Sequence, residues 1–449
     1  MKTKFKMDKE NKEFNFAHEV VNEYNRNLFL TGRAGTGKTT FLKYQKKKSN
    51  KKMIIVAPTG VSAINAGGVT INSFFQIPYT PFPPNDIRLQ PETYIKKDNI
   101  FKSFIFNKEK LQIIKNLELL IIDEISMVRC DTMDVIDSIL RHFRNSDEPF
   151  GGVQVLMIGD PYQLSPIVKK EEWDILKKHY KSPYFFSSKV ITRCDYIYLE
   201  LKKIYRQKDL KFIKLLNCVR ENIMTENELF TLNSRNNLNY KGDLNKYIFL
   251  GTHNKQVDEI NQNELNNIDS EQFCYDAEIN GEIDNGSITA PHKLCLKVGA
   301  RVMFLKNDNS ENQYYNGKLG NIIELNDEKI IVICDDGIKV NVKKSRWENF
   351  QYSFDDKKGK VIEETKGTFL QYPLKLAWAI TIHKSQGLTF EKVIADLNDA
   401  FAEGQVYVAL SRCTSLEGLI LKSKIKSSNI KLSKEVVEFG KVKEGRIQV

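Results

Sequence analysis

Glycines, a lysine and threonines are spaced for phosphate binding between Gly32 and Thr40, directly after the short apolar run 28–31. Because glycines lack a Cβ, backbone N–H groups can curl around phosphates, while the lysine reaches the β- and γ-phosphates and a hydroxyl binds Mg²⁺. A predicted helix starts at residue 41, so strand, loop and helix follow one another as a P-loop requires. We predict that a nucleoside triphosphate and Mg²⁺ are bound by Gly32, Gly35, Thr36, Gly37, Lys38, Thr39 and Thr40.

Two carboxylates, Asp123 and Glu124, follow the apolar run 119–122. The first can complete the Mg²⁺ shell together with Thr39, and the second can orient or deprotonate the attacking water. Gln163 follows a further apolar run, and its neutral amide can contact the γ-phosphate at the carboxyl edge of the same sheet. These residues predict hydrolysis of the triphosphate, whereas the alternative for the carboxylates is an acidic strand end that faces solvent.

Arginines that could complete the reaction follow later in the chain. An arginine supplied by another domain stabilises the charge that develops during phosphoryl transfer, and it can raise the rate by roughly 10³- to 10⁵-fold. Arg206 lies in a Tyr-Arg-Gln segment, and Arg412 ends an Ala-Leu-Ser-Arg segment. Each arginine by itself also fits a surface residue in a salt bridge, so their assignment depends on the surrounding motifs.

The composition favours a globular protein with an anionic partner. The net charge of +11 and the pI near 9.0 suit a phosphate backbone, although a coding genome of biased composition can also produce a chain rich in Lys, Asn and Ile. No run approaches the roughly 18 apolar residues of a membrane span, and the first eight residues resemble no secretory signal. We expect a cytoplasmic protein, nucleoid-associated if bacterial, without a membrane partner. The seven cysteines form no C-x-x-C pair, which argues against a zinc ribbon and a disulfide framework and favours buried thiols.

Apolar runs alternate with helical segments along most of the chain, as in parallel sheets with crossover helices. Two regions depart from this pattern. Residues 76–111 hold five of the twelve prolines among aromatic residues, which suggests a small insertion with little regular sheet. Residues 298–369 contain short strand-like pieces separated by Asn, Asp and Gly, which fits a small antiparallel barrel.

Seven segments, in order, carry a resemblance to the PIF family of DNA helicases in superfamily 1B. Residues 57–75 resemble the second motif of that family, and residues 381–389 resemble its fifth motif. Residues 205–207 and 409–412 are similar to its fourth and sixth motifs, and residues 127–154 resemble a stretch peculiar to the family. The resemblance extends from about residue 14 to about residue 425 and includes the P-loop and the carboxylates.

The resemblance implies an α/β fold with two RecA-like lobes and ATP between them, Arg206 and Arg412 reaching over from the second lobe. It implies a first lobe over residues 1–195, including a wedge subdomain at 76–111. The second lobe would comprise 196–297 and 370–449, and 298–369 would be an inserted barrel of the Src-homology-3 type. The implied activity is ATP-dependent 5′→3′ translocation on single-stranded DNA with unwinding of forked or structured DNA, carried out by a monomer.

The resemblance also implies further contacts, with two departures. Gly387 would belong to the nucleotide site, and Thr59, Asn72, Phe74, His383 and Lys384 would line the DNA path. Of the neighbouring Phe74 and Phe75, we expect one ring to be buried and the other exposed for base stacking. Family members read adenine with a glutamine upstream of the P-loop, for which Asn15 would substitute here, and Asn72 replaces the usual histidine.

Other functions fit parts of the sequence. A nucleotide-switched protein could clamp nucleic acid without unwinding it, and an RNA-directed helicase could use the same contacts to backbone and base faces. A small-molecule kinase fits least well, because it would not use the segment around His383 or a second lobe.

Overall fold

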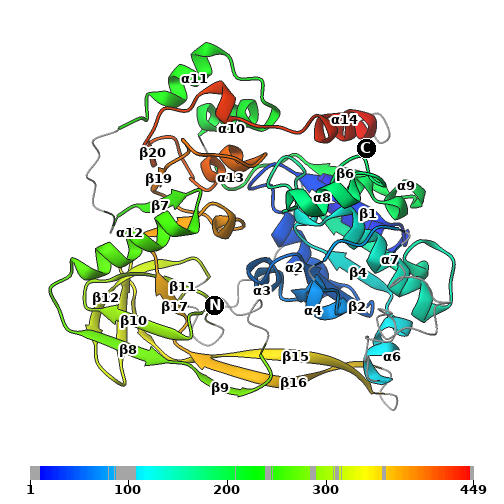
Figure 1. Cartoon of the computed structure of the whole chain (residues 1–449), viewed down its shortest axis with the longest axis horizontal. Coiled ribbons are helices and arrows are strands. Elements are labelled where there is room, and N and C mark those ends of the chain that lie inside the picture. Colours follow the sequence, from blue (N-terminus) through cyan, green and yellow to red (C-terminus); the bar gives the residue numbers. More distant parts are fainter. Residues whose placement is uncertain are drawn as a thin grey trace. The chain divides into compact units, whose positions relative to one another are not determined.

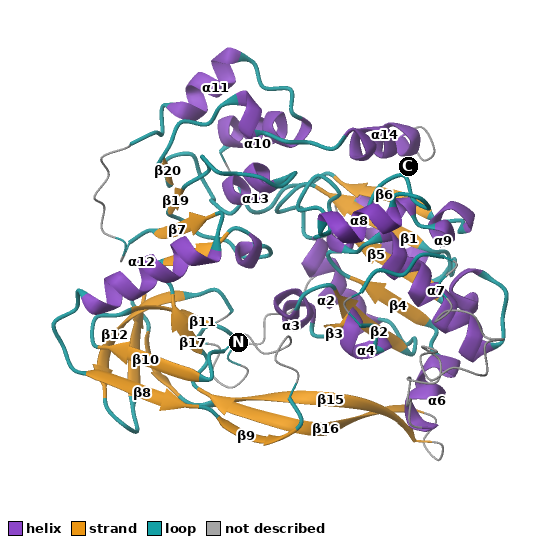
Figure 2. Ribbon diagram, viewed as in Figure 1, coloured by secondary structure: helices purple, strands orange, loops and turns teal. Residues whose placement is uncertain are grey.

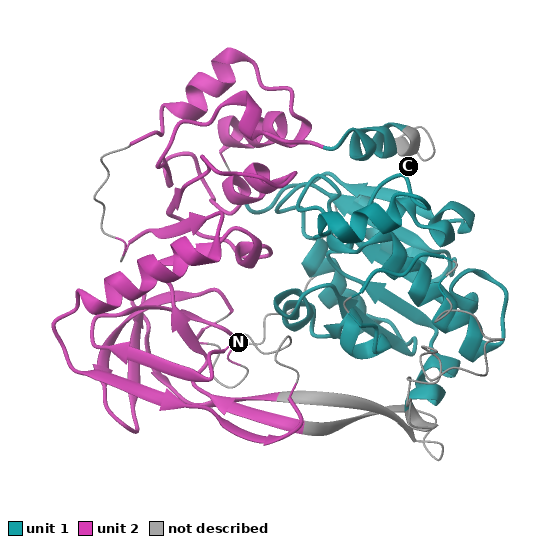
Figure 3. Ribbon diagram, viewed as in Figure 1, with its two compact units in different colours: residues 1–206, 351–364, 433–449 teal, residues 207–350, 365–432 magenta. Residues whose placement is uncertain are grey.

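A computed structural model of the chain describes residues 11–78, 80–84, 86, 108–207, 209–237, 244, 246–283, 290–306, 308, 313–314, 316–355 and 360–444. The chain forms two compact units (Figure 3). Residues 1–206, 351–364 and 433–449 belong to the first unit, and residues 207–350 and 365–432 belong to the second. The α/β architecture predicted from the sequence is confirmed, with a parallel sheet in each unit and further antiparallel sheets.

The first unit contains a six-stranded parallel sheet in the order β3-β2-β4-β5-β1-β6 (Figure 1 and Figure 2). Its strands are short apolar runs, as expected where both faces of a parallel sheet are covered. They are β1 (Leu28–Gly32), β2 (Met53–Ala57), β3 (Val69–Thr70), β4 (Leu119–Ile122), β5 (Gln154–Ile158) and β6 (Ile197–Leu201). The order places the carboxyl end of β5 between those of β1 and β4, so the segments after these three strands share one edge.

Helices cover both faces of this sheet (Figure 2). They are α1 (Lys12–Asn22), α2 (Lys38–Lys48), α3 (Gly60–Ala66), α4 (Ile71–Phe75), α6 (Lys108–Asn116), α7 (Cys130–Arg144), α8 (Lys170–Leu176), α9 (Lys189–Arg193) and α14 (Lys434–Glu444), with 3₁₀ turns η2 (Ile125–Met127), η3 (Pro149–Gly152) and η4 (Phe185–Ser187). Successive side chains of a strand point to opposite faces of the sheet, and each face has its own hydrophobic core. Phe29 packs with residues of α4, α6 and α7, while its neighbours Leu28 and Leu30 pack with α1 and α2.

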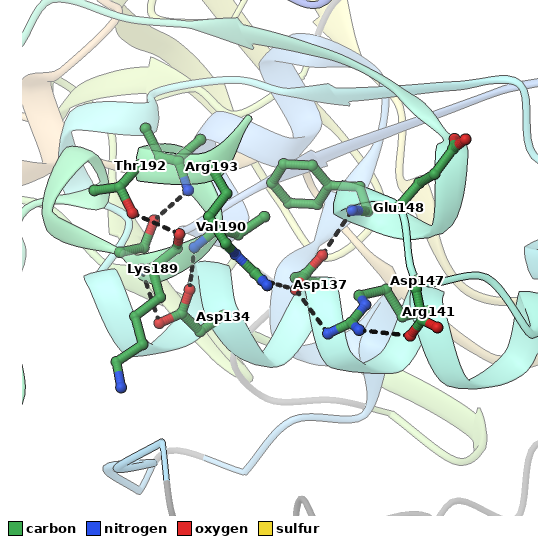
Figure 4. Close-up of polar contacts among 12 residues, drawn as sticks. Asp134, Asp137, Arg141, Asp147, Glu148, Lys189, Val190, Thr192 and Arg193 are labelled. Atoms are coloured by element: carbon green, nitrogen blue, oxygen red, sulfur yellow. Dashed lines mark hydrogen bonds and ion pairs between the residues drawn. The ribbon is translucent and has the colours of Figure 1, made fainter. Parts of the chain in front are cut away.

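Two carboxylates of α7 bind segments that precede and follow β5 in the chain (Figure 4). Asp134 accepts hydrogen bonds from the N–H groups of Lys189 and Val190 at 3.1 and 2.9 Å. Asp137 accepts from the N–H of Phe150 at 2.6 Å and from Arg193 at 3.2 Å. Burial raises the pKa of both carboxyls, so the hydrogen bonds offset a real desolvation cost. The family-like stretch 127–154 therefore has a structural role within the first unit.

Two domain boundaries predicted from the sequence are wrong. Strand β6 pairs with β1 in parallel over five residues, so residues 196–206 belong to the first unit rather than to a second lobe. Helix α14 also belongs to the first unit, where the ring of Phe439 stacks on Phe186 with centroids 4.3 Å apart. Local apolar patterns reveal a strand or a helix, but they do not show which sheet it joins.

The insertion predicted at 76–111 lies largely outside the described residues. Its beginning is anchored, since the N–H of Phe82 donates to Asp131 of α7 at 2.9 Å. The end of the predicted insertion overlaps the start of α6, whose Ile113 and Ile114, just beyond it, are buried in the core of the first unit. The assignment of a wedge subdomain stays a prediction.

The second unit contains a four-stranded parallel sheet in the order β18-β7-β19-β20. Its strands are β7 (Ile248–Gly251), β18 (Ala379–Thr381), β19 (Val393–Ala395) and β20 (Leu419–Leu421). Its helical segments are α10 (Leu210–Glu221), α11 (Glu226–Asn233), α12 (Asn254–Asn266), α13 (Gln405–Ser411), η5 (His383–Ser385) and η6 (Ser427–Asn429). Asn261 of α12 fastens the edge strand, because its side chain donates to the Ala379 carbonyl and accepts from the Ala379 N–H.

Antiparallel sheets form the rest of the second unit. A five-stranded sheet has the order β14-β13-β12-β11-β17. Its strands are β11 (Arg301–Phe304), β12 (Leu319–Leu325), β13 (Ile330–Cys334), β14 (Lys339–Val342) and β17 (Leu374–Leu376), beside a pair made by β8 (Gln272–Asp276) and β10 (Lys293–Lys297). The long strands β15 (Ser345–Asp355) and β16 (Lys360–Gln371) join β9 (Glu278–Gly281) in a separate sheet. The antiparallel region is therefore wider than the predicted 298–369, because β8, β9, β10 and β17 take part in it.

The expectation that all cysteines are buried thiols holds for five of the seven. Cys130, Cys194, Cys218, Cys334 and Cys413 are free and buried. Cys274 and Cys295 instead form a disulfide, because the register of β8 and β10 sets them opposite each other with Cα atoms 4.1 Å apart. Strand register is not visible in cysteine spacing, which explains the missed pair. Within the part of the chain that the structure describes, no helix has the length and apolar character to cross a bilayer.

Candidate functional site

The P-loop connects β1 to α2, as the sequence predicts. Gly32, Gly35 and Gly37 have φ angles of 151°, 80° and 92°, a region that side chains with a Cβ rarely adopt. A Cβ on Gly32 would also lie 2.6 Å from the Thr36 hydroxyl. The Lys38 ammonium donates to the Gly32 carbonyl at 2.5 Å and to the Arg33 carbonyl at 3.1 Å, so it lies across the loop.

Threonines of the loop have different surroundings. Thr36 is buried and donates to the Arg33 carbonyl at 2.9 Å, so its side chain braces the loop. Thr39 and Thr40, in the first turn of α2, are exposed. Exposure leaves the Thr39 hydroxyl accessible for the predicted Mg²⁺ contact.

Asp123, Glu124 and Gln163 follow β4 and β5 at the edge that carries the P-loop. Burial raises the pKa of Asp123 to about 8, with a further contribution from the neighbouring Glu124 charge, while the Lys38 and Lys43 charges act in the opposite direction. Asp123 is thus close enough to Lys38 to feel its charge. Gln163 is buried, and its amide lies 3.4 Å from a carboxylate oxygen of Asp160. The structure therefore brings the predicted catalytic groups of the first unit to one sheet edge.

Tyr205 is a neighbour of the P-loop that sequence reasoning treated only as part of a motif. Its N–H donates to the Gly35 carbonyl at 2.8 Å, and a Cβ on Gly37 would lie 3.6 Å from its ring. Its hydroxyl accepts from the Asn11 side chain at 3.1 Å, and 47% of the residue is exposed. An aromatic face beside a phosphate loop can contact a base. The signal was present in the sequence, since this aromatic residue directly precedes Arg206.

The residues weighed for adenine recognition lie on two helices. Asn15 belongs to α1, whose N-terminal residue Asn11 bonds Tyr205. Gln45 of α2 is fully buried and bonds the side chains of Asn22 and His18, so its amide is used for packing α2 against α1. The role of Asn15 at the base stays a prediction.

The two predicted catalytic arginines have different surroundings. Arg206 lies at the boundary between the two units, as the last residue of the first, and its role at the triphosphate stays a prediction. Arg412 belongs to the second unit and is 1% exposed. Its guanidinium donates to the carbonyls of Val408, Leu388 and Ser385 at 2.9, 3.2 and 3.5 Å and to the Ser411 hydroxyl at 2.8 Å. In this arrangement Arg412 holds backbone together, and its contact with a triphosphate stays a prediction.

The predicted DNA contacts of the first unit are partly engaged in local structure. Thr59 caps α3 by accepting from the Ser62 N–H at 3.2 Å, and Asn72 donates to the Ile77 carbonyl at 2.8 Å. The expectation of one exposed phenylalanine is wrong, because Phe74 and Phe75 are 1% and 0% exposed. Their rings pack edge to face in the core, since the short helix α4 turns both toward the sheet. Phe74 therefore presents no face to a base.

His383, Lys384 and Gly387 lie after β18 in the second unit. Burial lowers the pKa of His383, and its ring is roughly parallel to that of Phe401, with centroids 6.2 Å apart. Phe401 is 54% exposed and also contacts His253, which follows β7. Lys384 and Gly387 are exposed, and Gly387 has a φ angle of 80°. Phe401 thus offers the exposed ring that Phe74 does not, and its position in a loop gave no sequence signal.

A P-loop at the carboxyl edge of a parallel sheet, with Asp-Glu and glutamine on neighbouring strand ends, defines a P-loop nucleoside triphosphatase. Residues 7–221 match the family described as PIF1-like helicase, and residues 285–325 match the 2B domain of the DNA helicase Pif1. The ATP-dependent DNA helicase Pif1 of Campylobacter jejuni is 31% identical over 92% of this chain and 94% of its own. The chain spans 58% of the length of a zebrafish PIF1 relative.

Solved structures of Pif1 helicases are also similar to this chain. A Bacteroides Pif1 in complex with ADP-AlF4 is 42% identical, covers 97% of both chains and superposes with a TM-score of 0.86. A Bacteroides Pif1 helicase in complex with ADP-AlF3 and single-stranded DNA is 41% identical over 97% of both chains, with a TM-score of 0.70. The chain belongs to the PIF1 helicase family, and it is a DNA helicase and ATP hydrolase.

Proposed function

We propose that this chain moves 5′→3′ along single-stranded DNA and separates duplex or structured DNA ahead of it, using ATP bound at the P-loop edge. The observation that carries the proposal is the convergence of Lys38, Asp123, Glu124 and Gln163 at one edge of a sheet. It is supported by the likeness to helicases solved with a transition-state analogue and with single-stranded DNA. The direction of movement rests on family resemblance.

The residues at the P-loop edge fit a magnesium ion. Asp123 supplies a carboxylate and Thr39 an exposed hydroxyl, both of them hard oxygen donors that suit Mg²⁺. Among the described residues there is no cluster of three or more His, Cys, Asp or Glu side chains that would hold a metal, which is usual where substrate phosphates supply the remaining ligands. When bound, the ion would neutralise charge on the phosphates.

The side chains have separable roles in the proposed hydrolysis. Lys38 leaves its two loop carbonyls to contact the phosphates, and Glu124 accepts a proton from the attacking water. Glu124 has a left-handed backbone with φ 49°, which directs the chain sharply after β4. Gln163 senses the γ-phosphate without neutralising it, because its amide carries no charge.

A fork assay tests the proposal. A fluorophore and a quencher on the two strands of a DNA fork report separation, and forks with a single 5′ tail or a single 3′ tail are compared in ATP and Mg²⁺. We expect separation of the 5′-tailed fork and little of the 3′-tailed fork. Binding without separation of either fork would identify a nucleotide-switched clamp, and separation that requires an RNA loading strand would identify an RNA-directed motor.

We also propose that the chain acts as a monomer in the cytoplasm, or at the nucleoid if it is bacterial. Its basic net charge of +11 supports residence on nucleic acid. Mass measurement of the protein on a fork in solution distinguishes one copy from two.

A further inference from the structure

A cavity of about 490 Å³ lies within the second unit between α12, β10, β17 and β18. Its wall is largely apolar, with Val257 and Leu265 from α12 and Leu294 from β10. Its charged lining is mainly cationic and consists of Lys293, Lys375, Lys384 and Asp258. A cavity of this kind can accept an anionic group that is attached to an apolar body.

Lys375 is the unusual member of this lining. It lies on β17 opposite Met303 of β11, and the residue is partly buried. Burial lowers its pKa to about 8, and the charge of Lys384 acts in the same direction. Among the residues that the structure describes, no carboxylate forms an ion pair with Lys375, and Asp258 is the one acidic residue in the cavity lining.

Two other buried cations of the same unit are paired with carboxylates. Arg301 contacts both carboxylate oxygens of Asp335 at 2.5 and 2.6 Å, and Lys318 contacts Asp336 at 2.8 Å. An unpaired cation in a desolvated place is costly, and a second cation beside it adds repulsion. A partly buried lysine that has a second, exposed lysine beside it at the same cavity is therefore best explained by an anion that binds there.

We propose that this cavity binds a phosphate group of the DNA strand, with Lys375 and Lys384 as its ligands and the apolar wall against the attached sugar. The inference rests on the proposed function, because the strand is the source of the phosphate. A lysine ammonium is a compact charge that suits phosphate. Lys384 belongs to η5, next to the histidine that contacts the exposed ring of Phe401, so the cavity adjoins other groups suited to a strand.

The proposal makes strand binding depend on pH. The charged groups that face Lys375 are Asp258 from α12, Lys293 from β10 and Lys384 from η5, while β11 contributes the uncharged Met303. Below about pH 8 Lys375 is charged and attracts phosphate, and above it the free protein loses this charge. Affinity for the strand should therefore fall as pH rises through this value.

The test measures binding of fluorescent single-stranded DNA to the full chain by anisotropy at several pH values and salt concentrations. The variants are Lys375→Met, Lys375→Arg and, as a matched control, Lys339→Met on the exposed face of β14. Lys375→Met should weaken binding about tenfold near neutral pH and lower the salt slope by about one. Lys375→Arg should retain affinity and remove the loss between about pH 7 and about pH 9, because arginine stays charged.

Equal affinity of Lys375→Met and Lys339→Met would overturn the proposal, as would a pH dependence that persists in Lys375→Arg. A parallel titration uses inorganic pyrophosphate in a Lys38→Ala background. If Lys375→Met weakens pyrophosphate binding and leaves DNA binding unchanged, the cavity takes a free anion and the assignment to DNA is wrong. The proposed function fails separately, if the unaltered protein binds DNA but does not open the fork.

Discussion

The P-loop lysine and the arginine near the end of the second unit were both inferred from motifs, yet their surroundings are opposite. Lys38 is partly exposed and donates to two carbonyls of its own glycine-rich loop, contacts that phosphate oxygens can replace. Arg412 is 1% exposed and donates to four acceptors of α13 and of the segments that pack on it. A sequence motif thus identifies a position where one residue type is required. It does not show whether that residue contacts the ligand itself or holds in place other residues that contact the ligand.

The same contrast separates the two arginines. Arg206 ends the first unit beside Tyr205, which contacts the P-loop directly, whereas Arg412 is committed to the backbone of its own unit. If Arg412 acts on the triphosphate, it must exchange strong internal hydrogen bonds for phosphate contacts. Substitutions that report both turnover and stability can distinguish the two situations.

Lys38→Ala should have the largest effect on turnover. Removing the cation that stabilises the transferred phosphate should lower ATP turnover by about 10³-fold or more. The melting temperature should stay nearly unchanged, because the two loop carbonyls that Lys38 contacts can bind water instead. Turnover is measured by phosphate release and stability by thermal unfolding, with DNA binding as the control that should persist. Fork separation by this variant would show that the P-loop assignment is wrong.

Arg412→Ala should affect both observables. The change removes buried hydrogen bonds to the carbonyls of Val408 and Leu388, which should lower the free energy of unfolding by about 3 kcal/mol. Turnover of the folded protein should fall at least about tenfold if the residue also stabilises transferred charge. Both are measured well below the melting temperature. A large stability loss with normal turnover would make Arg412 purely structural.

Arg206→Ala should affect turnover but not stability, in contrast to Arg412→Ala. Because Arg206 is only partly buried, we expect a fall in turnover of at least about tenfold with little change in melting temperature. Nucleotide affinity, measured with a fluorescent ATP analogue, should be retained. A variant that turns over ATP normally would remove Arg206 from the catalytic set.

Phe401→Ala should have the smallest effect and concern DNA alone. Loss of a stacking face is expected to weaken single-stranded DNA binding by about 1–3 kcal/mol. Phe230→Ala on α11 is the matched control, since that ring is 78% exposed and lies on a different surface element. Anisotropy titrations of both variants at one salt concentration make the comparison. Equal affinities would mean that Phe401 is no stacking platform.

The first sheet was predictable because its strands are uninterrupted β-branched and apolar runs. The predicted run 119–122 coincides with β4, and the P-loop follows β1 as its glycine spacing requires. The groups that act on the triphosphate were likewise visible, since ligand chemistry fixes residue types at short spacings.

What the sequence did not reveal depends on contacts between distant segments. The pairing of β6 with β1 and the stacking of Phe439 on Phe186 decide domain membership, yet neither leaves a local pattern. The burial of Phe74 depends on how α4 meets the sheet, and the Cys274 disulfide depends on the register of β8 with β10. Nothing in the local sequence distinguishes Lys375 from an ordinary strand lysine, because its burial depends on neighbours that are distant in the chain.

The most direct measurement of the central claim is steady-state ATP turnover with and without single-stranded DNA. Our account joins a nucleotide edge in the first unit to strand-binding groups in the second, so DNA should accelerate turnover by at least about tenfold in the unaltered protein, and Lys38→Ala should show no turnover under either condition. Turnover that is substantial but indifferent to single-stranded DNA would contradict the account, because hydrolysis would then be uncoupled from the strand.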